Sequence, residues 1–179
     1  EEYSELHVIT GCATPADVER SLHLGISEFY VKKGAKLSFT MVHKWSEQVD
    51  VRPRSATVVE DSGTFLSSYA VLSPLRSIQT YPKVRLVGPG ARAELYSVVY
   101  GSKDSKYDVG GSLSLEGRGS KGKIISRTIA TDSTEVIARG DLVGRVNGVK
   151  ARLEFNGLLL SERARIVAIT QLEALAEEV

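Results

Sequence analysis

The chain has 179 residues, of which 42% are hydrophobic, and this is enough for one domain, residues 1–179, with a sizeable apolar core. Its 23 basic and 22 acidic side chains leave a formal net charge of +1, and no apolar run nears the ~18 residues that span a bilayer, so neither nucleic acid nor a membrane is an expected partner. One cysteine, Cys12, excludes an internal disulfide framework and a zinc site of several cysteines, and we expect a soluble, cytoplasmic protein.

The N-terminal part of the chain is predicted to form strands. Residues 6–10 alternate apolar and polar side chains and predict a strand, and residues 11–15 (Gly-Cys-Ala-Thr-Pro) then predict a turn. Residues 26–31 and 36–42 alternate in the same way. They predict consecutive strands joined by a tight turn in which Gly34 adopts positive φ.

A glycine-led segment then recurs along the chain. The glycines that begin it are separated by 29, 27, 29 and 29 residues, at Gly34, Gly63, Gly90, Gly119 and Gly148. Weaker strand-like copies lie about half a period later, so a unit of about 14 residues, a turn plus a strand, occurs twice per repeat. A β-sandwich is the alternative for alternating strands. The constant period favours a parallel β-helix, because each stacked coil must return to the same place after the same number of residues.

The remaining segments are predicted to be loops and a C-terminal element. Residues 73–79 and 101–108 are polar and resemble long loops. The last strong strand is expected near residues 165–169. Residues 171–179 have a helical composition and predict a short helix or tail. The open ends of such a solenoid expose unpaired strand edges, which predicts association or covering by other segments.

Residues 117–123 match GxGxxG and approach the sequence of a phosphate-binding loop. Ile124 stands where that loop needs Ser or Thr to hold magnesium, and the following residues alternate like a strand instead of opening a helix. A corner of the repeat therefore explains these glycines better than a nucleotide site. The histidines His7, His23 and His43 lack metal-binding spacing, although stacked coils would bring residues one repeat apart together.

Cys12 and the residues around the single tryptophan are the remaining candidates for chemistry. A single cysteine is more often a small buried hydrophobe than a reactive group. Trp45 could simply cover one end of the core, and Lys44, Arg52 and Arg54 could form a solvated face. If these basic residues lie near Cys12, they favour its thiolate form.

Several short motifs follow one another along the chain, at residues 9–15, 21–23, 31–35, 43–46, 81–82, 90–92, 108–110, 138–140 and 157–160. Taken in order, they resemble the SufB/SufD family, the scaffold proteins of the SUF system for iron–sulfur cluster assembly. The similarity covers essentially the whole chain and looks closest to short archaeal members. The resemblance implies an all-β fold, a right-handed parallel β-helix, and a scaffold that is not an enzyme. It also implies that a Ser-His-Glu-Ala motif and helices that bind SufC follow residue 179.

The resemblance further implies partners and a cargo. The implied partners are the ATPase SufC, a SufB-type or SufD-type chain or a second copy that pairs through the β-helix as a dimer, and a cysteine desulfurase system. The iron–sulfur cluster is implied to be transient and dependent on partners.

The resemblance assigns roles to four residues, and at a fifth position the chain departs from the family's pattern. Cys12 matches the position that accepts sulfur or ligates the cluster. His43 stands at the position of the family's glutamine, Trp45 matches its tryptophan, and Arg54 matches a basic residue in the path of sulfur transfer. Phe155 occupies the position of a second cysteine, which leaves a SufD-like structural partner without sulfur chemistry as an alternative. A carbohydrate-active β-helix enzyme is a further alternative, against which the single tryptophan and four phenylalanines argue.

Overall fold

The computed structural model describes residues 1–14 and 19–176, and within them the chain forms strands joined by turns and short loops. The strands are β1 (Glu5–Ala13), β2 (Ser21–Val31), β3 (Lys36–Lys44), β4 (Val49–Val59), β5 (Thr64–Val71), β6 (Ser77–Thr80), β7 (Lys83–Leu86), β8 (Arg92–Gly101), β9 (Lys106–Leu115), β10 (Lys121–Ala130), β11 (Glu135–Gly144), β12 (Lys150–Leu159) and β13 (Arg165–Ala174). In these ranges there is no helix of the length and apolarity needed to cross a membrane.

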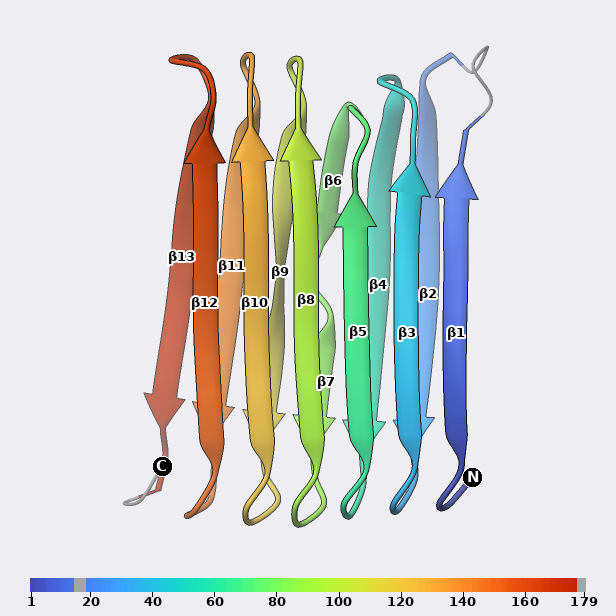
Figure 1. The fold of residues 1–179 in the computed structure, drawn as a ribbon, viewed down its shortest axis with the longest axis vertical. Helices are drawn as coiled ribbons and strands as arrows, with labels where there is room; N and C mark the ends of the chain where they lie inside the picture. Colours follow the sequence, from blue (N-terminus) through green and yellow to red (C-terminus); the bar gives the residue numbers. More distant parts are fainter. Residues whose placement is uncertain (15–18, 177–179) are drawn as a thin grey trace.

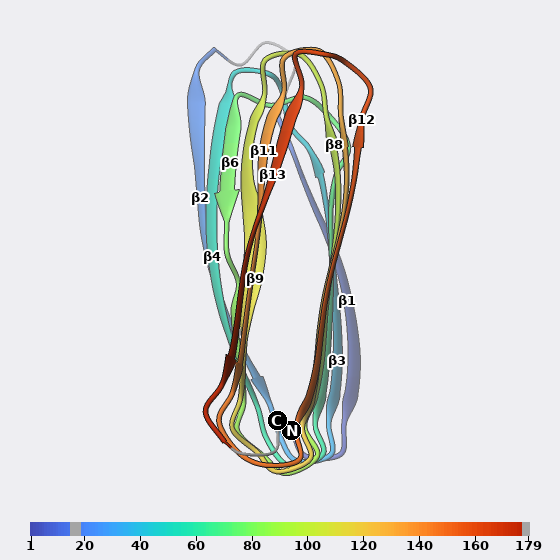
Figure 2. The ribbon, with the colours of Figure 1, turned by 90° about the vertical axis from the view of Figure 1, so that its left-hand side faces the viewer.

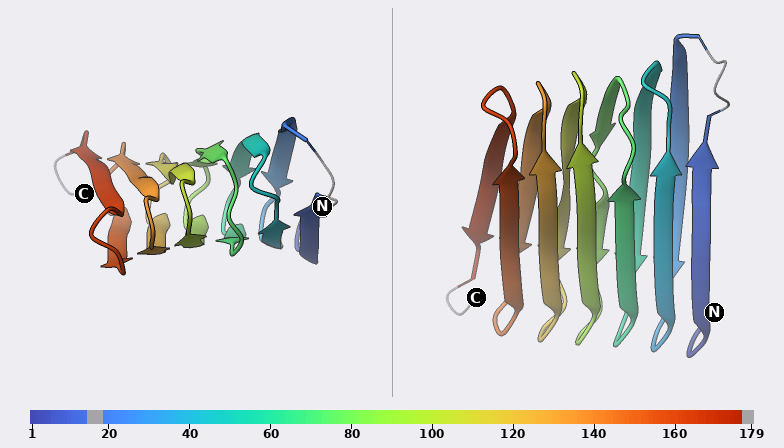
Figure 3. Two further views of the ribbon diagram at one scale, coloured as in Figure 1. Left: turned by 90° about the horizontal axis from the view of Figure 1, so that it is seen from above. Right: turned by 45° about the horizontal axis from the view of Figure 1, so that its top comes forward.

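The strands form two parallel sheets that face each other. The front sheet has the order β1-β3-β5-β8-β10-β12, and the back sheet has the order β13-β11-β9-β6-β4-β2, with β7 also pairing with β4 and β9 (Figure 1). The chain runs up a front strand, crosses over, runs down a back strand and moves one strand along the axis, which makes a right-handed coil (Figures 1 and 3). The predicted right-handed parallel β-helix is confirmed, and the β-sandwich alternative is wrong.

The register of the front sheet explains the sequence period. Lys36 pairs with Thr64, Thr64 with Arg92, and Arg92 with Lys121, so neighbouring strands of this sheet are offset by 28 or 29 residues there. Residues one repeat apart are therefore neighbours on adjacent strands.

Alternation along the strands fills the space between the sheets. In β9 the side chains of Lys106 and Asp108 face outward. The apolar side chains at odd-numbered positions are buried, namely those of Tyr107, Val109, Leu113 and Leu115. Figure 2 shows the two sheets face to face, and the interior is the space between them, which side chains fill. It contains two apolar clusters, a lower one near the glycine corners that includes Phe65, Leu86, Leu113 and Leu115, and an upper one at the opposite ends of the strands that includes Trp45, Val51, Ile78, Tyr107 and Val109.

The lower corners are four-residue turns whose third residue has positive φ. Gly34 has φ of 64°, and the amide of Ala35 donates to the Lys32 carbonyl at 3.0 Å. In the next coil the residue at this third position is Ser62, at φ 54°, and Gly63 is the fourth residue of the turn. Gly90, Gly119 and Gly148 continue the series with φ between 69° and 78°. The segment that matches GxGxxG is thus a corner followed by strand β10, as predicted.

Two predicted irregular segments are shorter than the sequence suggested. Gly11 to Ala13 were expected in a turn but continue β1, because each pairs with a residue of β3, the last pair being Ala13 with Lys44. Pro15, which ended the predicted turn, lies outside the described residues. Of the predicted long loop at residues 73–79, Ser77 and the residues after it belong to β6. The predicted loop at residues 101–108 leaves only residues 102–105 between strands.

The predicted C-terminal helix is wrong where the structure describes it. Residues 171–174 continue β13, in register with β11 from Asp141↔Gln171 to Gly144↔Ala174. Residues 177–179 lie outside the described part. Pairing with a preformed parallel edge therefore outweighs the helical preference of Gln, Leu and Ala here.

The last coil leaves its interior side chains uncovered. Leu113, Leu142 and Leu172 form one column of register neighbours, with exposed fractions of 0%, 2% and 69%. The same break occurs in the front sheet, where Leu159 of β12 is 51% exposed. This end of the solenoid presents apolar side chains and an unpaired strand edge, as predicted for an open coil.

Candidate functional site

Cys12 faces the interior of the coil at the upper end of β1. It is the register partner of His43 on β3, and it is half-buried against the upper apolar cluster. The side chains of a strand alternate between faces, and Thr10 and Cys12 are each less exposed than their neighbours Ile9, Gly11 and Ala13. The thiol is therefore presented to the interior and not to the outer face of the front sheet.

Aromatic rings from neighbouring strands surround this position. His43 is only 2% exposed and stacks on Trp45, with 5.2 Å between ring centroids and 24° between ring planes. Its other side meets Tyr69 of β5 at 4.9 Å, and His23 of β2 lies 4.6 Å from Trp45. We call Cys12, His23, His43, Trp45 and Tyr69 the Cys12 cluster.

The Cys12 cluster holds buried polar atoms that make no hydrogen bond within the described part of the chain. They are both ring nitrogens of His43, Nε1 of Trp45 and the hydroxyl of Tyr69. Burying such an atom without a partner costs roughly 1–3 kcal/mol. Four such atoms lie close to the only thiol of the chain. This region could therefore form hydrogen bonds with a polar group bound there.

Burial sets the protonation states in the Cys12 cluster. Burial, and secondly the nearby His23, lowers the pKa of His43 to about 4, so the imidazole is neutral at pH 7. Burial, and secondly the charge of Cys12, raises the pKa of Tyr69 above its ordinary value. The phenol therefore keeps its proton and is available as a hydrogen-bond donor.

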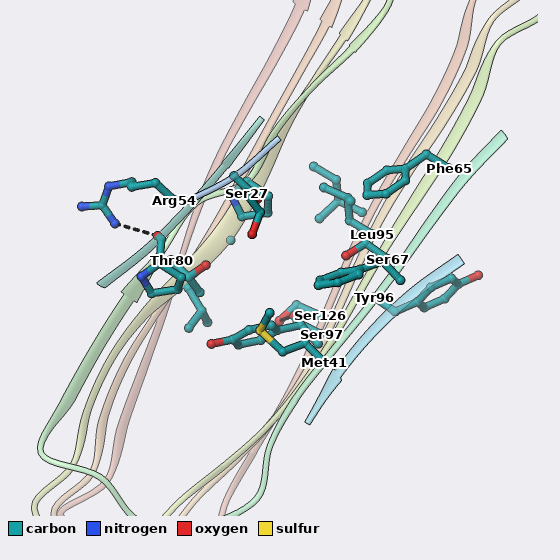
Figure 4. Close-up of a pocket in the computed structure, with 18 of the residues that line it drawn as sticks. Ser27, Met41, Arg54, Phe65, Ser67, Thr80, Leu95, Tyr96, Ser97 and Ser126 are labelled. Atoms are coloured by element: carbon teal, nitrogen blue, oxygen red, sulfur yellow. Dashed lines mark hydrogen bonds between the residues drawn. The ribbon is translucent and has the colours of Figure 1, made fainter. Parts of the chain in front are cut away.

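A cavity of about 70 Å³ lies between the sheets beside this cluster, and Tyr69 lines it. Figure 4 shows Ser27 and Thr80 of the back sheet across from Ser67 and Ser97 of the front sheet. The remaining lining residues are largely hydroxyl-bearing or apolar, and include Met41, Ser55, Phe65, Leu95 and Ser126. Tyr69 is thus shared between the Cys12 cluster and a partly polar cavity.

Arg54 does not join the Cys12 cluster in this structure. Its guanidinium donates to the Pro53 carbonyl and to the carbonyl and Oε1 of Gln79, at 2.9 to 3.1 Å. The side chain is exposed and extends away from the cavity that its strand borders (Figure 4). The role that the family resemblance gives Arg54 remains a prediction.

Phe155 lies at the far end of the same sheet. It is on β12 and pairs with Ser126, whereas Cys12 is on β1. Five strand spacings of roughly 4.8 Å each separate these two strands. The two positions that the family resemblance connects therefore do not meet within this chain.

No metal centre is formed by the side chains of residues 1–14 and 19–176. His7 lies on the outer face, 3.1 Å from a Glu5 carboxylate oxygen, away from His23 and His43. The described residues contain no group of three or more His, Cys, Asp or Glu side chains positioned for a metal ion. An iron–sulfur cluster normally needs about four ligands, so Cys12 could supply only part of the set.

Tyr69 and His23 are members of the cluster that the sequence did not single out. Tyr69 is the register partner of Met41, which lies two residues before His43 on the same face of β3. The 28-residue period and strand alternation could together have identified Tyr69. His23 is brought close by the fold of the first coil, which the period alone does not specify.

Comparisons with known proteins identify sequences that are similar to this chain. A family model described as "SUF system FeS cluster assembly, SufBD core domain" matches residues 1–179. The chain is 50% identical over 178 residues to an "Iron-sulfur cluster assembly SufBD family protein" homolog of Methanothermobacter thermautotrophicus, covering 99% of this chain and 43% of the relative. It is 47% identical over 174 residues to a SufBD family protein of Archaeoglobus fulgidus, with 97% and 46% covered.

More distant bacterial proteins are also similar. A SufBD family protein of Staphylococcus aureus is 26% identical over 166 residues, with 92% of this chain and 36% of the relative covered. The chain therefore spans less than half the length of these three relatives.

Proposed function

This chain belongs to the SufBD family of the SUF system for iron–sulfur cluster assembly, and we propose that it is a scaffold, not an enzyme, whose Cys12 accepts sulfur for the cluster. One observation carries the proposal. The only thiol faces the interior among buried polar atoms that have no partner in the described part of the chain, beside a cavity. A cysteine that served only as packing would need no such surroundings.

The proposed step is a transfer of sulfane sulfur. The Cys12 thiolate attacks the terminal sulfur of a persulfide carried by a protein of the cysteine desulfurase system. A new S–S bond forms on Cys12, the donor's S–S bond breaks, and the donor leaves as a thiolate. Neutral His43 is the register partner of Cys12 on the adjacent strand, and its ring is stacked on Trp45. With a pKa of about 4 it does not hold the thiol proton, which passes to solvent when the thiolate forms.

The partners follow from the family and from the open last coil. We propose that a SufB-type or SufD-type chain, or a second copy, covers the apolar end at β12 and β13 to form a dimer, and that SufC binds to the assembled protein in the cytoplasm. The cluster is cargo that stays only briefly, and the partner contributes the ligands that Cys12 lacks.

Anaerobic cluster assembly on the full-length protein tests the role of Cys12. With SufC, the partner chain and a desulfurase present, we expect Cys12→Ala to slow cluster formation at least about tenfold, because the sulfur acceptor is absent. Thr10→Val, on the same face of β1, is the matched control and should assemble cluster at the wild-type rate. Assembly at the wild-type rate by Cys12→Ala would falsify the assignment.

Phe155 supports a second candidate function. Because this side chain cannot ligate iron, the chain could act as a SufD-like structural partner that stabilises the complex without handling sulfur. Capture of SufC and a SufB-type chain by wild type and by Cys12→Ala distinguishes the two functions when it is combined with the assembly rate. If Cys12→Ala captures both proteins like wild type and also assembles cluster at the wild-type rate, the chain is a structural partner. If it captures both proteins like wild type but assembles cluster more slowly, the chain is a sulfur acceptor.

A further inference from the structure

The hydroxyl of Tyr69 is buried, yet the fold gives it no partner among the described residues. The other large buried tyrosine of the upper apolar cluster is different. Tyr107 donates weak hydrogen bonds to the carbonyls of Ser73 and Tyr100, both at 3.4 Å. The two residues have the same chemistry and share one cluster, but only Tyr69 keeps an unused donor.

The position of Tyr69 relates it to Cys12 through His43. Cys12 and His43 are register partners, and the ring of Tyr69 lies 4.9 Å from the ring of His43. Cys12 and Tyr69 pack against the same apolar cluster, and the charge of Cys12 acts on the Tyr69 hydroxyl. Tyr69 also lines the cavity between the sheets, so it belongs both to the Cys12 cluster and to the lining of that cavity.

We propose that Tyr69 is a positioning residue for the sulfur carried by Cys12, its hydroxyl donating a hydrogen bond to the terminal sulfur of the Cys12 persulfide. This role rests on the proposed function. No covalent step beyond the transfer described above is involved, and Tyr69 keeps its proton throughout.

A persulfide on Cys12 would supply the acceptor that the Tyr69 hydroxyl lacks in the part of the chain that the structure describes. With a thiol at Cys12 the hydroxyl has no partner within the described residues. Adding one sulfur lengthens the side chain by about 2.05 Å, the length of an S–S bond, into a region that contains this donor. A persulfide anion is also a better acceptor than a thiol, because hydrogen bonds to charged groups are the stronger ones.

Trp45 and His43 also carry unpartnered nitrogens in this region, but they do not line the cavity as Tyr69 does. Of the groups of the Cys12 cluster that have no partner among the described residues, only the Tyr69 hydroxyl therefore belongs to a residue that also borders free space between the sheets.

Equilibrium loading of Cys12 tests this role. The full-length protein is titrated with sodium polysulfide against a fixed concentration of a small thiol, and the fraction of Cys12 bearing one extra sulfur is measured by mass spectrometry. We expect Tyr69→Phe to require about tenfold more polysulfide for half-loading, the effect of losing one hydrogen bond to a charged acceptor. Tyr107→Phe, which removes a hydroxyl already used by the fold, should load like wild type.

Two further readouts separate positioning from a structural effect. In the unloaded protein, Tyr69→Phe should not change the alkylation rate of Cys12 and should not lower the melting temperature, because it removes a hydroxyl that has no partner among the described residues. Loading of Tyr69→Phe equal to wild type overturns the role of Tyr69 alone. A lower melting temperature with faster alkylation also overturns it, since the loss would then be structural. Absence of sulfur on wild-type Cys12 overturns the proposed function and this role together.

Discussion

His43 connects the Cys12 cluster to the stability of the fold. Its imidazole is buried and neutral, with a pKa of about 4 against an ordinary value of 6.5. Between these two values the unfolded chain binds a proton that the folded chain does not, so the free energy of unfolding falls as the pH falls from about 6.5 towards 4. The protonated ring would be a charge among aromatic rings, and within residues 1–14 and 19–176 no carboxylate shifts its pKa.

Denaturant unfolding at pH 7 and pH 4.5 should show this effect. We expect the wild-type protein to lose about 2 kcal/mol more than His43→Gln over this interval, because the variant lacks the buried titrating group. His7→Gln is the control, since His7 is exposed, and it should lose as much as wild type. Equal losses in wild type and His43→Gln would contradict the assigned protonation state.

The candidate site could be predicted only in part from the sequence. Cys12, His43 and Trp45 were found through the family resemblance, and the structure brings them together. Tyr69 was not singled out, although the 28-residue period and strand alternation place it near His43, because the period was not used to relate residues on three strands. Whether Arg54 faces inward or outward depends likewise on the register of β4, which short motifs do not reveal.

At the scale of single elements, two glycines of one corner should respond differently to substitution. Gly119 has φ of 70°, and a Cβ there would meet open space, so Gly119→Ala should cost about 1 kcal/mol from backbone strain alone. In Gly117 a Cβ would overlap the backbone of Gly88 in the adjacent coil. We expect Gly117→Ala to cost at least about twice as much, because the coils must separate to admit it.

Denaturant midpoints of the two variants measure this difference. Arg118→Ala, between the two glycines and exposed, is the control and should be close to wild type. A Gly119→Ala variant as destabilised as Gly117→Ala would show that close stacking of the corners is not what these glycines provide.

The strands and the period could be predicted, whereas the ends of several elements could not. The alternation of apolar and polar side chains and the glycine spacing predicted the parallel β-helix correctly, because every coil repeats the same geometry. The polar residues around Ser77 and the helical composition of residues 171–174 misled the prediction, since pairing with a neighbouring strand decides both segments. The glycine spacing did not reveal that Ser62, and not a glycine, has the positive φ of the corner at residues 60–63.

For the whole molecule, the uncovered last coil is a surface where the apolar interior reaches solvent. Leu172 continues an interior column but is 69% exposed, next to an unpaired edge strand. If a SufB-type or SufD-type chain or a second copy covers this end, Leu172→Lys in the full-length protein should weaken the pairing at least about tenfold, because it buries a charge in the interface.

A dilution series followed by sedimentation velocity measures the pairing. Ile26→Lys, on the outer face of β2 at the opposite end, is the control and should pair like wild type. An unchanged dissociation constant for Leu172→Lys, with or without a lower melting temperature, would show that this end is not the pairing surface.

The central claim is that the interior thiol receives sulfur, and mass spectrometry of the peptide containing Cys12 tests it most directly. The full-length protein is incubated anaerobically with the cysteine desulfurase system and cysteine, and free persulfides are then trapped. The account predicts a mass gain of one sulfur atom on Cys12, absent without cysteine and absent in Cys12→Ser. An unmodified Cys12 in a folded protein, under conditions in which the desulfurase turns over, would contradict it.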